Sequence, residues 1–147
     1  RGPDINAESL QRLRDNNVRY HTMAEIQKRG FDKVLARVLR EVDKGPDTFF
    51  VSIDVSVIDP GQLIAAGRVV ANGLGVDEVT SAIRQVCAAK NIVAFEITDL
   101  APMLDYSELS VTNANALLNA CLVGIAVRKA GLKPDYIHPF ALDHGQR

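Results

Sequence analysis

Two short apolar segments constrain the fold of this chain more than any other feature. Residues 48–53 (TFFVSI) and 91–95 (NIVAF) are rich in β-branched and aromatic side chains and show little polar alternation. This pattern is typical of strands buried on both faces of a sheet. Segments with helical patterns precede, separate and follow the two strands. The alternation predicts an α/β fold, with a parallel β-sheet and helices on both faces.

Helix signals recur along the chain as capping side chains, apolar residues at helical spacing and glycines after the last turn. Between the first two helices, residues 18–20 (VRY) are predicted to form a short strand. The length of the chain favours one domain over residues 1–147. The predicted helices cover residues 6–16, 22–30, 31–42, 77–87 and 112–129.

The charge pattern argues against two classes of partner. The formal net charge is -1 and both signs are interspersed, so no nucleic-acid footprint and no polybasic membrane patch is expected. Residues 114–127 form the longest apolar stretch, which Asn115 and Asn119 interrupt. This stretch is predicted to be a buried helix rather than a membrane span, with both asparagines in buried hydrogen bonds. No signal-peptide pattern is visible at residue 1.

The two cysteines, Cys87 and Cys121, lie in unrelated apolar segments. They are predicted to be separate buried thiols, with a disulfide as the less favoured alternative. Unpaired thiols suit a reducing compartment, so a cytoplasmic location is expected.

Acidic residues gather where each predicted strand ends. Asp54 and Asp59 follow the first strand, and Glu96 and Asp99 follow the second. The carboxyl ends of parallel strands share one edge of the sheet, where ligands of open α/β folds bind. Such a carboxylate group suits a hard divalent cation or a cationic substrate. Asp59 precedes a proline and is more typical of a turn, and Glu96 could instead be solvated or ion-paired.

Other candidate sites have little support. His21 lies in a turn and is expected to be a surface or packing residue rather than a base, while His138 and His144 lie in an irregular tail. Ser52 and Ser56 lack the glycines of a nucleophile elbow. The sequence contains no glycine-rich phosphate loop and no zinc-type spacing of cysteine or histidine.

Residues 52–60 (SIDVSVIDP) resemble the ureohydrolase signature Ser-x-Asp-x-Asp-x-x-Asp-Pro of the arginase and agmatinase family. Four more segments resemble family segments in the same order, so the chain is similar to the C-terminal half of that family. The resemblance implies a three-layer α/β/α fold. These four segments are residues 18–26, 69–74, 94–102 and 133–136.

The resemblance also implies a chemistry. Family members hold a pair of manganese ions that activate a water for attack on the guanidinium carbon of arginine, agmatine or a related amidine. Asp54 matches a metal ligand, and Ser56 stands where the second ligand, an aspartate, belongs. Asp99 stands at the position of a substrate-binding glutamate, and Glu96 stands where an aspartate is usual. No residue of this chain is assigned as the catalytic residue.

Three departures from the family pattern leave two functions open. Ser56 removes a carboxylate, Asp99 is one methylene shorter than glutamate, and Arg68 adds a positive charge that would repel cations. The family's histidine-bearing ligand segments lie upstream of the matched half. The first hypothesis is an amidinohydrolase whose N-terminal half is missing here or supplied by another chain; the second is a non-catalytic subunit, regulator or binding module. A phosphoryl-transfer domain with Asp54 as nucleophile is a weaker third.

Half of a parallel sheet would leave an open edge and an uncovered apolar face. A close partner is therefore expected, either the remaining half of the fold, another chain or a second copy in a homo-oligomer.

Overall fold

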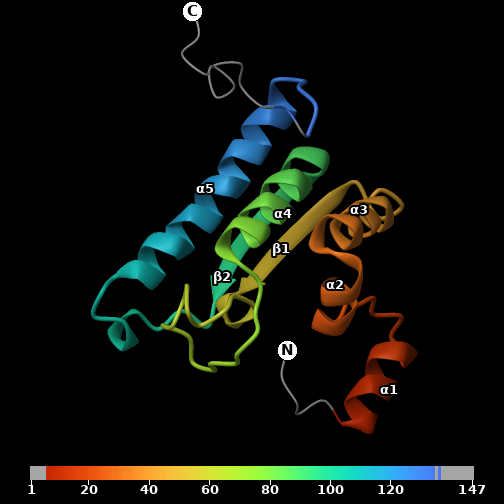
Figure 1. Ribbon diagram of the computed structural model, residues 1–147. Helices are drawn as coiled ribbons and strands as arrows, with labels where there is room; N and C mark the ends of the chain where they lie inside the picture. Colours follow the sequence, from red (N-terminus) through yellow and green to blue (C-terminus); the bar gives the residue numbers. More distant parts are fainter. Residues whose placement is uncertain (1–5, 135, 137–147) are drawn as a thin grey trace, which may run out of the picture.

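The computed structural model describes residues 6–134 and 136 (Figure 1). Three helices come before the first strand: α1 (Ala7–Asp15), α2 (Met23–Arg29) and α3 (Phe31–Val42). Strand β1 (Thr48–Asp54) leads through the 3₁₀ turn η1 (Val55–Val57) and a loop to α4 (Val76–Ala89). Strand β2 (Asn91–Thr98), the turn η2 (Pro102–Leu104) and α5 (Leu109–Lys129) complete the order. His138 and His144 lie outside the described residues.

Local capping signals set the helix starts. The Asn6 side chain accepts the N–H of Ser9 at 2.8 Å, and the Thr22 hydroxyl accepts the N–H of Glu25 at 3.1 Å. Each contact satisfies an N–H that has no partner within the helix. The five predicted helices are present, and α5 begins three residues earlier than predicted, at Leu109 rather than Thr112.

The predicted strand at residues 18–20 is wrong. These residues are irregular, and the N–H of Val18 donates to the carbonyl of Leu13 at 2.8 Å, which closes the end of α1. A strand requires a neighbouring strand for its ladder of hydrogen bonds. The described part of the chain places none beside this segment.

The two predicted strands pair in parallel, with Val51 opposite Phe95 and Asp54 opposite Thr98. Helix α4 forms the crossover between them, as the βαβ unit requires. One face of the pair packs through Ile53, Phe95 and Ile97 on the core that α4 and α5 build. The α/β class is thus confirmed.

The opposite face of the sheet is uncovered in the described structure, where Phe50 is 56% and Val93 is 65% exposed. Along β1, half-buried residues alternate with exposed ones. The prediction that both strand faces are buried is therefore wrong for this part of the chain, and helices cover one face. Exposed positions of the strands carry apolar residues such as Phe50 and Val93. The sequence therefore shows no alternation of polar and apolar residues.

The core is built by α4, α5, η1 and the loop that follows η1, and α4 and α5 run side by side (Figure 1). Cys87 and Cys121 form a disulfide between these helices, with Cα atoms 5.3 Å apart, and both residues are buried. The prediction of two separate thiols is wrong, because helix packing joins segments that are 34 residues apart in sequence. Cysteine usage therefore gives no support to a reducing cytoplasm.

Helix α5 is apolar on more than its core side. Leu117 is fully buried, whereas Leu122 is 54% exposed. By length and composition alone, α5 could cross a membrane, a property that core helices of globular domains share. Asn115 and Asn119 are exposed, so the prediction that they form buried hydrogen bonds is wrong. Their positions on the helix turn them away from α4.

Candidate active-site edge

Asp54 is the last residue of β1 and its side chain is exposed. Its Oδ1 atom accepts the N–H of Ser56 at 2.9 Å, so the carboxylate caps the turn η1. Strand pairing places Asp54 opposite Thr98, one residue before Asp99. The predicted metal ligand and the predicted substrate-binding residue therefore come from the same edge of the sheet.

Asp99 follows β2 in a left-handed backbone conformation, with φ of 64°. Its carbonyl accepts the N–H of Gly67 at 3.2 Å and its Oδ2 accepts the N–H of Arg68 at 3.3 Å. The Asp99 carboxylate lies so close to Gly67 that a Cβ atom at position 67 would collide with it. Asp99 thus holds the loop before α4 against the end of β2, and aspartate is among the few residues that tolerate this φ.

Glu96 lies on the uncovered face of the sheet, opposite Ser52. The Ser52 hydroxyl donates to Oε1 of Glu96 at 2.7 Å. Side chains alternate along a strand, so Ser52 and Asp54 share this face with Glu96. The structure thus gives Glu96 a neutral hydrogen-bond partner and places its carboxylate on the same face as Asp54.

Asp59 organises the loop after η1. Its Oδ1 accepts the N–H of Gly61 and its Oδ2 accepts the N–H of Gly73, each at 3.0 Å. The same loop is held by the bridge between Ile58 and Leu74. The prediction that Asp59 serves a turn is confirmed.

A buried polar network joins the loop after η1 to the start of α5. This network was not predicted from the sequence. Asp105 Oδ2 accepts both the N–H and the hydroxyl of Ser110, at 2.7 Å and 2.6 Å. The Ser110 oxygen in turn accepts the N–H groups of Ile64 and Ala65, both at 3.1 Å. Hydrogen bonds from the side chain of Ser107 and from Ser110 hold the pKa of Asp105 far below its ordinary value. The Asp-x-Ser turn pattern at residues 105–107 is the signal that could have revealed this anchor.

The donor set of this edge does not fit a binuclear manganese site by itself. Asp54 offers carboxylate oxygens, while Ser56 offers a neutral hydroxyl at the predicted position of the second ligand. No three histidine, cysteine, aspartate or glutamate side chains are grouped to hold a metal in residues 6–134 and 136. Divalent cations of this class prefer several carboxylate or carbonyl oxygens, so further ligands would have to come from outside the described residues.

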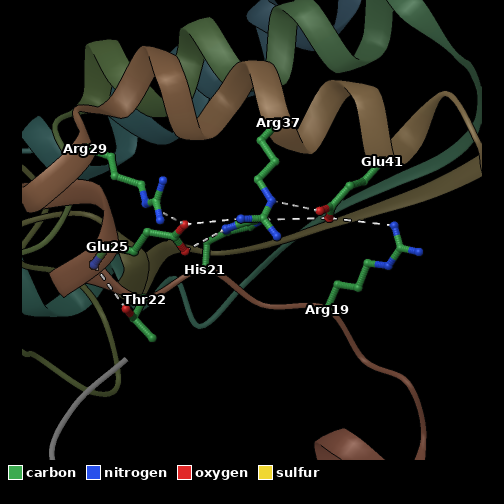
Figure 2. Close-up of polar contacts among 7 residues, drawn as sticks. All are labelled: Arg19, His21, Thr22, Glu25, Arg29, Arg37 and Glu41. Carbon is green, nitrogen blue, oxygen red and sulfur yellow. Dashed lines mark hydrogen bonds and ion pairs between the residues drawn. The ribbon is translucent and has the colours of Figure 1, made fainter.

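His21 belongs to a second polar cluster, formed with residues of α2 and α3 (Figure 2). Its Nδ1 lies 3.0 Å from Oε2 of Glu25 and its Nε2 lies 3.8 Å from Oε2 of Glu41. The contact with His21 is the main cause that lowers the pKa of Glu25, and the contact with Arg37 is the main cause that lowers the pKa of Glu41. Of the two expected roles for His21, surface or packing residue, its largely buried side chain agrees with packing. The i,i+4 pairs in α2 and α3 were visible in the sequence.

Two parallel strands joined through a helix, with carboxylates and an Asp-Pro turn after their carboxyl ends, define an α/β protein with an acidic edge at the strand ends. The sequence model of the Arginase family matches residues 1–124. The chain belongs to the arginase family.

Several relatives show the extent of the likeness. The chain is 29% identical to a formimidoylglutamase of Bacillus subtilis over 106 residues, which are 71% of this chain and 33% of that protein. It is 26% identical to an arginase of Plasmodium berghei over 67% of this chain and 28% of that protein. An agmatinase of Bacillus subtilis is 26% identical over 51% of this chain and 26% of its own length.

Solved structures share the fold. The formimidoylglutamase structure from Bacillus subtilis superposes with a TM-score of 0.78 at 24% identity, over 84% of this chain and 39% of that one. The proclavaminate amidino hydrolase of Streptomyces clavuligerus gives a TM-score of 0.76 at 24% identity, over 87% of this chain and 42% of that one. The chain therefore spans about a quarter to a third of the length of these curated relatives and about two fifths of these solved structures.

Proposed function

We propose that this chain forms the substrate-binding edge of an amidinohydrolase-type protein, which cleaves a C–N bond in a guanidino or linear amidine compound such as arginine or agmatine. In this proposal Asp99 and Glu96 bind the cationic group and Asp54 is a manganese ligand. The observation that carries it is the register of Asp54 with Thr98, because that register brings Asp54 and Asp99 to one edge of the sheet. Carboxylates at such an edge are suited to cationic ligands.

Hydrolysis under this proposal needs metal ligands beyond those described. Asp54 supplies a carboxylate donor, and the aligned part of the Bacillus subtilis formimidoylglutamase is only 33% of that protein. The other ligands would come from the remainder of the family fold, in the same polypeptide or in a partner. When bound, manganese would supply a nucleophilic water; the residues of this chain would orient the substrate.

A second candidate is a non-catalytic family member that serves as a subunit, as a regulator or as a binding module. The observation that favours it is Ser56, whose N–H is tied to Asp54 and whose side chain carries no charge. A hydroxyl cannot replace the charge and paired oxygens of a carboxylate.

Urea release and ligand binding separate the two candidates. The full polypeptide containing this chain is incubated with manganese and with arginine or agmatine. The first candidate predicts urea release that Asp99→Asn reduces by about 100-fold or more, since a charge-assisted contact is lost. The charge-matched control Asp47→Asn, at an exposed site before the amino end of β1, should keep its activity. Binding that depends on Asp99, without urea release, indicates the second candidate. If the protein shows no binding and no urea release, both candidates are contradicted.

We further propose that the uncovered sheet face of this chain is covered by the remainder of the arginase fold or by a second copy. The exposed Phe50 and Val93 support this, because a two-stranded parallel sheet is not stable with one apolar face in water. In the assembled protein, amide exchange at residues 48–54 should be slow, and Phe50→Asp should weaken assembly. A monodisperse monomer of this chain alone, with slow exchange of the same amides, would contradict the proposal.

A further inference from the structure

Positive charge is concentrated on one surface formed by α2, α3 and the segment before α2. A hollow of about 550 Å³ between α2 and α3 contains one acidic and five basic side chains. A second hollow of about 490 Å³ contains Arg19, Lys44, Glu41 and His21. Arg37 lines both hollows, so they adjoin. The charged residues of the first hollow are Glu25, Lys28, Arg29, Lys33, Arg37 and Arg40.

This surface contrasts with the rest of the chain. It holds seven of the seventeen lysine and arginine residues but two of the eighteen aspartate and glutamate residues. The net charge of the whole chain is -1, so the positive excess is local. Beyond Arg29 and Lys33, the adjoining hollow contains Asp32, Asp77 and Glu78, which ends the positive surface on that side.

The centre of the surface already holds a carboxylate between two guanidinium groups (Figure 2). Oε1 of Glu25 lies 3.3 Å from Nε of Arg29 and 3.6 Å from Nη1 of Arg37. The guanidinium geometry suits carboxylates, and the network with Glu25 restrains both arginines in advance. Restrained side chains lose less conformational entropy when a ligand binds.

The outer cations of this surface are exposed among the described residues. Lys28, Lys33 and Arg40 are exposed and form no ion pair with an acidic side chain in residues 6–134 and 136. Lys33, Arg37 and Arg40 extend over about two turns of α3, a length of about 10 Å. Cations spread along a helix and across two hollows match several carboxylates in a row better than one compact anion.

We infer that this basic groove, defined by Lys28, Arg29, Lys33, Arg37 and Arg40, binds an acidic peptide segment of a partner protein. The surface lies on α2 and α3, whereas the site proposed for hydrolysis lies at the ends of β1 and β2, so the two can be tested separately. Electrostatic complementarity of this kind mainly sets specificity and association rate, and salt weakens it.

The test is fluorescence anisotropy with a labelled deca-glutamate peptide and the full polypeptide, with any copurifying partner retained. The variant K28Q/K33Q/R40Q should weaken binding by about ten-fold, from three exposed contacts. The control R14Q/K129Q/K133Q removes the same charge from exposed residues elsewhere and should change affinity less than about two-fold. Circular dichroism confirms that both variants are folded.

Three results would overturn the inference. Equal weakening by the two triple variants would show non-specific attraction. Tighter binding of inorganic tripolyphosphate than of the peptide, through the same residues, would assign the groove to a compact phosphate ligand. Salt-sensitive self-association that K28Q/K33Q/R40Q abolishes, without peptide binding, would assign it to a second copy.

Discussion

The hydroxyl of Ser110 donates a hydrogen bond of 2.6 Å to Oδ2 of Asp105, at the start of α5. Its oxygen also receives the N–H groups of Ile64 and Ala65. One buried hydroxyl therefore joins the loop that follows β1 to the helix that follows β2. Because Asp99 holds the neighbouring backbone of Gly67 and Arg68, this anchor helps to fix the edge on which the candidate site lies.

Removal of the Ser110 hydroxyl should lower the stability of the fold, although only one atom is lost. Ser110→Ala leaves two loop N–H groups without their acceptor and Asp105 without a donor, which should lower the free energy of unfolding by about 2 kcal/mol. The control Ser81→Ala, at an exposed helical position, should change it by less than about 0.5 kcal/mol. Urea denaturation of both variants measures the difference; equal stability of the two would contradict the role of Ser110.

The same network predicts a dependence of stability on pH. The pKa of Asp105 is depressed in the folded protein, so the ionised carboxylate stabilises the fold above its ordinary value of 3.8. That contribution is lost as the pH falls below 3.8 toward the depressed value. The urea midpoint of Asp105→Asn should therefore lie below that of the wild type by a constant amount from pH 7 to about pH 5. The gap should narrow in more acidic solution, and a gap that stays constant down to pH 3 would show that the ionised form is not the stabilising one.

The disulfide between α4 and α5 should stabilise the folded chain. Breaking the link between Cys87 and Cys121 should cost about 3 kcal/mol, since it restrains the unfolded chain. The double variant Cys87→Ala/Cys121→Ala and the reduced wild type should both melt at lower temperature than the oxidised protein. The reduced wild type is the control that keeps both side chains. Mass spectrometry after alkylation in denaturant without reductant should show no added mass, and two added groups would mean that both residues are thiols.

Close packing of the same helices should make Gly124 sensitive to any added side chain. A Cβ atom at this position would collide with the carbonyl oxygen of Arg84 and lie 2.8 Å from Cβ of Cys87. Backbone atoms cannot move aside without separating the helices, so Gly124→Ala should destabilise the fold by about 1–3 kcal/mol. Ala126→Leu adds more atoms at an exposed position of α5 and should change stability by less than about 0.5 kcal/mol. Thermal melts of both variants check this, and a Gly124→Ala protein as stable as Ala126→Leu would contradict the packing.

Features that depend on neighbours in sequence were predictable. The caps at Asn6 and Thr22 use atoms three residues away, and β1 ends at Asp54 where the apolar run ends. The common edge of Asp54 and Asp99 followed from the rule that parallel strands point the same way, without any knowledge of side-chain packing.

Features that depend on distant segments were not predictable. Whether Cys87 meets Cys121 is decided by the contact of α4 with α5, and apolar side chains such as Phe50 look alike in sequence whether covered or exposed. Residues 18–20 have strand composition but no adjoining strand in the described structure. The Ser110 anchor joins positions 45 and 46 residues apart, so its turn signal alone did not disclose its partners.

The most direct test of the site at the strand ends is the manganese retained per polypeptide after equilibration and desalting. Manganese retention is measured for the wild-type full polypeptide, for its Ser56→Asp variant and for its Asp54→Asn/Ser56→Asp double variant. If Asp54 and position 56 face one metal position, Ser56→Asp should retain more manganese than the wild type, because a second carboxylate is restored. The double variant should lose that gain. Equal retention by the wild type and Ser56→Asp, or a gain that survives the loss of Asp54, would show that these residues do not share a metal position.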